Sequence, residues 1–293
     1  MKGPELLFDR RLQRQWLHRH QASIDKGDFL RAWVADDLAS RLLLVHRQLG
    51  CALVIGAGAR AIAPALVSTG KILEAVLCEP VAPAAVPAGR LVVGDSEALP
   101  FAEHSFNLAV SLLELHQIND LPGALVELRR VLKPDGLLLA TMIGGQSLQE
   151  LARAFAAGES ELRGGASPRV APMVDVRDLG GLVQRAGFAL PVVDVDPLNL
   201  TYASVGALMR ELRQLGCANA LNARSRRHLT KRLLAAVASA YEREVPAQDG
   251  RVTATIEILT VTAWSPGPGQ PQPLKPGSAQ VRLGDALGRR DRT

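Results

Sequence analysis

The sequence predicts an α/β protein whose mostly parallel, seven-stranded sheet is covered by helices on both faces. Short apolar runs alternate with amphipathic stretches along most of the chain, which is the pattern of strands joined by crossover helices. Several runs are apolar at every position, as expected for parallel strands that are buried on both faces. The 293 residues, 47% apolar and 22% charged, suit one large domain with an extension and exclude wholesale disorder.

Apolar runs and turn residues define the individual elements. The first strand, 51–55, is closed by Gly56, and the helices that follow are often ended by a glycine such as Gly70 or Gly187. The expected strands are 51–55, 72–78, 91–93, 106–112, 137–142, 189–195 and 253–264. The expected helices are 61–69, 121–132, 174–186, 205–215 and 224–244.

The chain around this sheet is expected to fall into three parts. Residues 1–49 form an arginine-rich, N-terminal helical cap, and residues 50–264 form the sheet-containing domain, with a helical insertion at about 203–245. Residues 265–293 form a tail that is expected to be irregular, because its first half is dense in proline and glycine.

Composition excludes several classes of protein. No run approaches the ~18 consecutive apolar residues of a membrane helix, so stable membrane insertion is not expected. The opening residues carry Glu5 and Asp9 among arginines and have no apolar core, which indicates neither a secretory signal nor a typical transit peptide and predicts a cytoplasmic location. Cys51, Cys78 and Cys217 have no spacing typical of a zinc site or a disulfide framework, and no metal site is predicted.

The net charge of +5 raises the question of nucleic-acid binding. Only six of the 34 basic residues are lysines and the arginines are spread along the chain, so nucleic acid is not the expected partner. The densest basic group runs from Arg224 to Arg232. Its favoured interpretation is the solvated face of a helix, and the alternative is a patch that faces phosphate or an acidic partner.

Chemistry-bearing residues follow three of the predicted strands. Gly56-Ala-Gly58 lies between the first strand and a helix, where glycines let the backbone approach a ligand. Glu79 ends the second strand, at the distance where such folds hold a carboxylate against ribose hydroxyls, and Asp95 follows the third strand, where it can accept from an adenine amine. Each acid alone is compatible with an ordinary loop, but their order together predicts a nucleoside-containing cofactor.

These motifs resemble a known series. The Gly-Ala-Gly turn, Glu79, GDSEALPFAEHSFNLAVS and LRRVLKPDGLLL are similar to the motifs of class I S-adenosylmethionine-dependent methyltransferases, over roughly residues 50–145. The resemblance implies a Rossmann-like class I methyltransferase fold, with S-adenosylmethionine as the cofactor. The residues that it implies for cofactor binding are Gly56, Gly58, Glu79, Asp95, Ser96 and Glu114.

A narrower resemblance covers nearly the whole chain. The strings FDRRLQRQWLHRH, SLLELHQINDLPGAL and GGASPRVAPMVDVRDLGGLVQRAGF are similar to the methyltransferase-like assembly factors of respiratory complex I, whose mitochondrial members hydroxylate an arginine of a complex I subunit. The methyltransferase that caps malonyl-acyl-carrier protein in biotin synthesis is a cousin. The resemblance implies an S-adenosylmethionine-dependent enzyme of a bacterial cytoplasm that hydroxylates or methylates a protein, with a complex I subunit as the expected partner.

Two positions depart from the family pattern. Val54 stands where an acidic residue commonly helps to order the methionine end of the cofactor, and Arg60 stands where a third glycine is usual. Arg60 at the start of the helix could either crowd the cofactor carboxylate or bind it. These departures keep a non-catalytic assembly chaperone open as an alternative, and the cousin keeps a small-molecule or acyl-carrier-protein methyltransferase open.

Candidate substrate-side residues follow the fourth strand and the sixth. His116 is a candidate base, and a hydrogen-bonded loop histidine is the alternative. Asn119 is a candidate substrate residue, although Asn-Asp before a helix is also typical of a helix N-cap. Tyr202 is a further candidate at the ligand edge. Ser167 and Arg169 lie in a Gly- and Pro-rich segment that is a candidate lid or partner-recognition loop.

Overall fold

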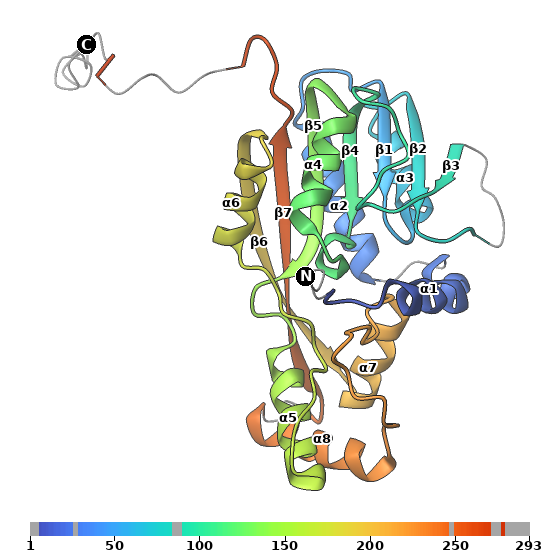
Figure 1. Cartoon of the computed structure of the whole chain (residues 1–293), viewed down its shortest axis with the longest axis vertical. Coiled ribbons are helices and arrows are strands. Elements are labelled where there is room, and N and C mark those ends of the chain that lie inside the picture. Colours follow the sequence, from blue (N-terminus) through green and yellow to red (C-terminus); the bar gives the residue numbers. More distant parts are fainter. Residues whose placement is uncertain (1–5, 26–28, 84–89, 246–248, 271–276, 279–293) are drawn as a thin grey trace, which may run out of the picture.

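A computed structural model describes residues 6–25, 29–83, 90–245, 249–270 and 277–278 (Figure 1). Seven strands form one sheet: β1 (Cys51–Ile55), β2 (Glu74–Glu79), β3 (Arg90–Val93), β4 (Phe106–Leu112), β5 (Leu132–Gly144), β6 (Ala189–Tyr202) and β7 (Val252–Trp264). The strand order is β3-β2-β1-β4-β5-β7-β6, and only β7 runs antiparallel to its neighbours. The predicted α/β class with a mostly parallel, seven-stranded sheet is therefore confirmed.

Helices cover both faces of the sheet. They are α1 (Arg10–Asp25), α2 (Phe29–Leu43), α3 (Ala59–Ser68), α4 (Leu121–Val131), α5 (Gln149–Arg163), α6 (Val176–Arg185), α7 (Val205–Gln214) and α8 (Lys231–Glu244), with a short 3-10 helix, η1 (Leu115–Gln117). α2 and α3 pack on one face, and α4 and α6 pack on the other, so the sheet separates two apolar cores. α5 and α8 lie together beside the far ends of β6 and β7 (Figure 1).

Strand lengths depart from the expected ranges in the second half of the sheet. β1 and β4 have the expected bounds, whereas β5 and β6 extend well past theirs. β7 explains the later ends of both strands, because it pairs with β5 as far as Gly144 and with β6 as far as Tyr202. The earlier start of β5 comes from β4, where Phe106 pairs with Leu132. Long antiparallel partners extend a strand beyond the apolar run that marks it in the sequence.

The expected helix 224–244 is wrong at its start. α8 begins at Lys231, because the Thr230 side chain accepts a hydrogen bond from the backbone N–H of Leu233 at 3.2 Å and caps the helix there. Upstream, Ser225 Oγ accepts from the backbone N–H of Arg227 at 3.2 Å in a local turn. The basic group Arg224–Arg232 is therefore mostly an irregular segment and not the face of a helix.

The N-terminal helices differ in how they are held. α2 buries Leu30, Leu38 and Leu42 in the same apolar core as Val54 of β1, so it is an integral part of that layer. α1 lies across the end of the sheet (Figure 1). Most of the expected tail, 265–293, lies outside the described residues. None of the helices that the structure describes is long and apolar enough to span a membrane.

Candidate functional site

The turn between β1 and α3 favours glycine at two of its positions. Gly56 has φ +122° and Gly58 has φ +90°, backbone conformations that residues with a Cβ rarely adopt. A Cβ at Gly56 would lie 2.6 Å from the carbonyl oxygen of Leu112 at the end of β4. Because α3 begins at Ala59, the turn places bare backbone and a helix N-terminus at the edge of the sheet.

Glu79 is tied to the residue that replaces the third glycine. Its side chain is 2% exposed, and it accepts a hydrogen bond from the backbone N–H of Arg60 at 3.2 Å. The Arg60 guanidinium forms an ion pair with the same carboxylate, with 3.4 Å between Nη1 and Oε2. Arg60 thus points toward the acid predicted to hold ribose.

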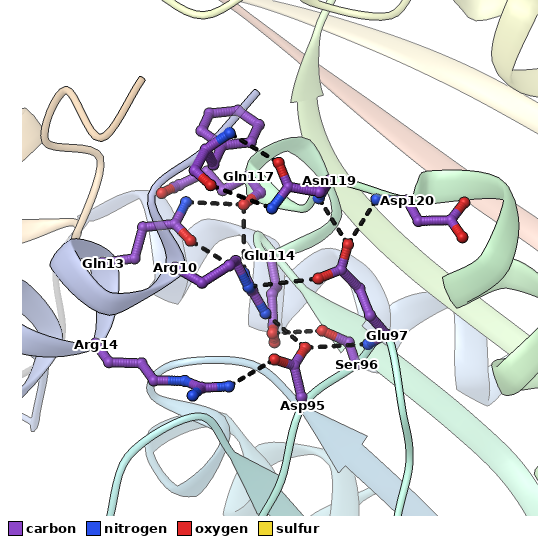
Figure 2. Close-up of polar contacts among 11 residues, drawn as sticks. Arg10, Gln13, Arg14, Asp95, Ser96, Glu97, Glu114, Gln117, Asn119 and Asp120 are labelled. Carbon is purple, nitrogen blue, oxygen red and sulfur yellow. Dashed lines mark hydrogen bonds and ion pairs between the residues drawn. The ribbon is translucent and has the colours of Figure 1, made fainter. Parts of the chain in front are cut away.

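Asp95 is held by two arginines of α1 (Figure 2). Arg10 Nη2 lies 2.6 Å from Oδ1, Arg14 Nη2 lies 2.7 Å from Oδ2, and the backbone N–H of Glu97 donates to Oδ1 at 3.1 Å. Burial raises the pKa of the Asp95 carboxyl, but the hydrogen bonds from Glu97, Arg10 and Arg14 outweigh it and hold the pKa below its ordinary value. The carboxylate therefore stays ionised at neutral pH.

Glu114 is the third acid at this edge. Ser96, one of the residues expected to bind the cofactor, is 3% exposed. Its hydroxyl donates a hydrogen bond to Oε1 of Glu114 at 2.6 Å (Figure 2). Burial raises the pKa of Glu114, and the nearby carboxylates of Asp95 and Glu79 raise it further. The glycine turn and the three acids thus come together at the carboxyl ends of β1 to β4, where ligands bind in open α/β sheets.

Two cavities adjoin at this edge, and Gln117 lines both. The first lies between α1 and the strand ends; its lining includes Arg10, Arg14, Arg31, Ala57, Pro80 and Glu114. The second is mostly apolar, and its polar lining consists of His116, Gln117, Arg169, Cys217 and Asn219. The lining residues that the structure gives for the second cavity include no aspartate or glutamate.

His116 is buried at the junction. The Gln117 side-chain amide lies 3.1 Å from His116 Nε2, and Cys217 Sγ lies 3.7 Å from the same nitrogen. Burial lowers the pKa of His116 to about 4, so the imidazole is neutral at physiological pH. Within the described chain, Nδ1 has no hydrogen-bond partner. His116 therefore lines the second cavity as a neutral ring whose buried Nδ1 has no partner among the described residues.

The low pKa of His116 predicts an acid-sensitive fold. The folded state binds this proton only near pH 4, whereas the unfolded chain binds it near pH 6.5, so stability falls as the pH drops through that interval. At pH 5 the penalty is about 2 kcal/mol. Urea unfolding of His116→Gln should show a smaller loss between pH 7.5 and pH 5 than the wild type. The same substitution at the exposed His18 should leave the loss unchanged, and equal losses in all three proteins would contradict the prediction.

The other two substrate-side candidates are placed differently. The Asn119 side chain binds the N-terminal segment: Oδ1 accepts from the backbone N–H of Phe8 at 2.7 Å, and Nδ2 donates to the Phe8 carbonyl at 3.2 Å. Asp120, and not Asn119, caps α4, accepting from Gly123 N at 2.8 Å. Tyr202 ends β6 and is 8% exposed in the apolar core, outside the linings of both cavities described above.

Several residues at the site were not among the sequence candidates. Arg10, Arg14 and Arg31 line the first cavity, and Gln117 and Cys217 lie at the junction. Arg10, Arg14 and Gln117 lie in the sequence strings that resemble the complex I assembly factors, and this resemblance was the only signal that could have indicated them. No group of three or more His, Cys, Asp or Glu side chains that could hold a metal ion occurs in the described part of the chain.

The sequence is similar to a protein family and to several known proteins. Residues 53–140 match a family model described as a methyltransferase domain. The chain is 36% identical to the mitochondrial arginine hydroxylase NDUFAF5 of Danio rerio, over 95% of this chain and 89% of that protein. It is 35% identical to the malonyl-[acyl-carrier protein] O-methyltransferase of Halorhodospira halophila, over 96% of each chain.

The chain belongs to the class I S-adenosylmethionine-dependent methyltransferase family. The crystal structure of YcgJ from Bacillus subtilis, with 15% identity and a TM-score of 0.53 over 80% of this chain and 99% of that one, shares the fold. S-adenosylmethionine is the cofactor of this family, and the residues present fit it. Ala57 of the glycine turn and Glu114 line the first cavity. Glu79 and Asp95 are not in that lining, but they lie at the same edge of the sheet and are carboxylates able to accept from hydroxyl and amine groups.

Proposed function

We propose that this methyltransferase-family protein binds S-adenosylmethionine in the first cavity and modifies an arginine of a protein during the assembly of respiratory complex I. The observation that carries the proposal is full-length similarity: the identity to the arginine hydroxylases of Danio rerio and Homo sapiens is 36% in both cases and covers 95% of this chain. The similarity therefore includes α1 and the α5–α8 region and extends beyond the cofactor-binding half.

The proposed roles follow from the placement of the residues. Glu79 holds the ribose, Asp95 accepts from the adenine amine, and the turn at Gly56 and Gly58 carries the methionine end. When bound, S-adenosylmethionine supplies an activated methyl group. The second cavity adjoins the first at Gln117 and receives the substrate side chain, with neutral His116 beside it. The proposed location is the cytoplasm.

A deletion strain tests this function. Membranes from the strain are expected to lose NADH dehydrogenase activity, and the wild-type gene should restore it. Mass spectrometry of the complex I subunits should then show one arginine that carries an added oxygen atom or an added methyl group in the wild type. The same arginine should be unmodified in the deletion strain. Normal activity and unchanged subunits would overturn the proposal.

A second candidate, methylation of an acyl thioester that bears a carboxyl group, is favoured by the lining of the second cavity. That lining contains no acid to pair with a substrate guanidinium, whereas it contains the cation of Arg169. Glu159 neutralises Arg169 but is shared with Arg163, so one positive charge is in excess. This candidate predicts biotin auxotrophy of the same strain with intact NADH dehydrogenase activity.

A further inference from the structure

We propose that α1 closes over the bound cofactor and that Arg10 and Arg14 are positioning residues that fasten this helix to Asp95. The proposal rests on the proposed function, because it assumes that the first cavity takes S-adenosylmethionine. It adds to that function two residues of the cofactor site and an order in which the two ligands bind.

α1 forms one wall of the first cavity. Arg10, Gln13, Arg14 and Leu17 line it from this helix, while Ala57, Pro80 and Glu114 line it from the strand ends. Asp95 is not among these lining residues, but Arg10 and Arg14, which pair with it, are, so a ligand in the cavity lies against the helix that these arginines fasten. Figure 2 shows the arginine side chains reaching from α1 to Asp95.

The fastening leaves Asp95 able to accept from a ligand. Oδ1 accepts from Arg10 and from the Glu97 backbone, whereas Oδ2 accepts, among the described residues, from Arg14 alone. A carboxylate has about four lone-pair positions. The arginines therefore orient Asp95 and keep its charge while an acceptor position remains for an exocyclic amine, so that fastening and ligand binding support each other.

Polar contacts hold α1 in place. Among its described side chains only Gln13, Gln21 and Ile24 are buried. Gln13 Nε2 donates to the Gln117 carbonyl at 2.8 Å, and Arg10 Nε lies 3.4 Å from Glu97 Oε2. An element with so little buried apolar surface opens at a low free-energy cost, which suits a helix that admits a ligand.

The segment before α1 extends this closure to the second cavity. The Asp9 backbone N–H donates to the Ala220 carbonyl at 2.8 Å, and the Arg224 guanidinium lies 3.2 Å from the Asp9 carboxylate. Phe8 forms a β-bridge with Leu221, and both line the second cavity. Seating α1 therefore completes a wall of the substrate cavity, so the cofactor binds before the substrate.

Calorimetry and hydrogen–deuterium exchange with S-adenosylhomocysteine test the proposal. In the wild type, ligand should slow amide exchange across α1 and residues 217–224. Arg10→Gln and Arg14→Gln should each weaken binding about tenfold and lose most of that protection, while Arg14→Lys should retain both. Arg19→Gln, at an exposed position of the same helix, should behave like the wild type.

A double-mutant cycle separates fastening from general damage to the fold. In an Asp95→Asn background, Arg14→Gln should have almost no further effect on affinity, since the charge to which Arg14 binds is gone. If the ligand binds the wild type but amide exchange in α1 is unchanged and the arginine variants bind normally, the proposed closure of α1 is overturned. The proposed cofactor site is then retained. If the wild type binds no ligand, the proposed function fails first.

Discussion

Replacing Glu159 with glutamine is expected to lower the free energy of unfolding by about 3 kcal/mol, because it leaves buried positive charge without its counter-ion. The Glu159 side chain is 1% exposed and pairs with Arg163, at 3.2 Å, and with Arg169. It also accepts from the backbone N–H and the hydroxyl of Ser167, both at 2.8 Å. Urea unfolding at pH 7 measures the loss.

The pH dependence gives the same prediction a second test. Burial raises the pKa of Glu159, but the hydrogen bonds from Arg169 and Ser167 outweigh it and lower the pKa. The contribution is therefore complete above the ordinary glutamate pKa and disappears as the pH falls through the lowered value. Wild type and variant should converge in acid. Glu161→Gln, exposed on α5, is the control, and an equal loss in both variants at pH 7 would contradict the account.

Glu79→Ala is expected to weaken S-adenosylhomocysteine binding about a hundredfold. In the proposed site, the substitution removes two hydrogen bonds that the ribose hydroxyls would donate to the carboxylate, each worth roughly 1.5 kcal/mol or more. It also removes the carboxylate beside the Arg60 guanidinium, whose side chain is 11% exposed, and this lowers stability. Calorimetry is therefore restricted to protein that circular dichroism shows to be folded.

Two further variants make the result interpretable. Glu79→Gln keeps the shape and one acceptor, and it should bind between the wild type and Glu79→Ala. Glu74→Gln changes the other end of β2, where the side chain is 44% exposed and pairs with Arg90, and it should bind normally. A folded Glu79→Ala protein with wild-type affinity would remove Glu79 from the site.

Most of the fold could be predicted from local sequence patterns. The apolar run 51–55 and its closing glycine predict β1 and the ligand-facing turn together, because burial on both faces and a positive φ each demand a particular residue type. The acids at strand ends were predictable for the same reason, since topology brings the ends of parallel strands to one edge. The helical periodicity of 224–244 did not reveal that the helix begins only at Lys231, because the start is set by the local cap at Thr230.

The contacts that the sequence did not predict are tertiary. Arg10 and Asp95 are 85 residues apart, and no periodicity in either segment indicates that they meet. From the sequence, the side chain of Arg60 could face either the cofactor carboxylate or Glu79, the acid predicted to bind ribose. Only the path of α3 beside β2 decides between them. A second cavity built from loops that follow β4, α5 and α7 is likewise a property of packing.

The central place of β7 between β5 and β6 has a consequence for biosynthesis. β6 pairs only with β7 among the described strands, and β7 is the last of them to leave the ribosome. Until residue 264 emerges, β6 has no partner and the exposed edge of β5 is a template for aggregation. The β1–β4 half assembles through shorter-range parallel pairs during translation, while the β6–α8 half waits for chain completion. Ribosome-stalled chains that end before β7 are therefore expected to be cleaved by protease within 189–245 and protected within 51–83 and 90–144.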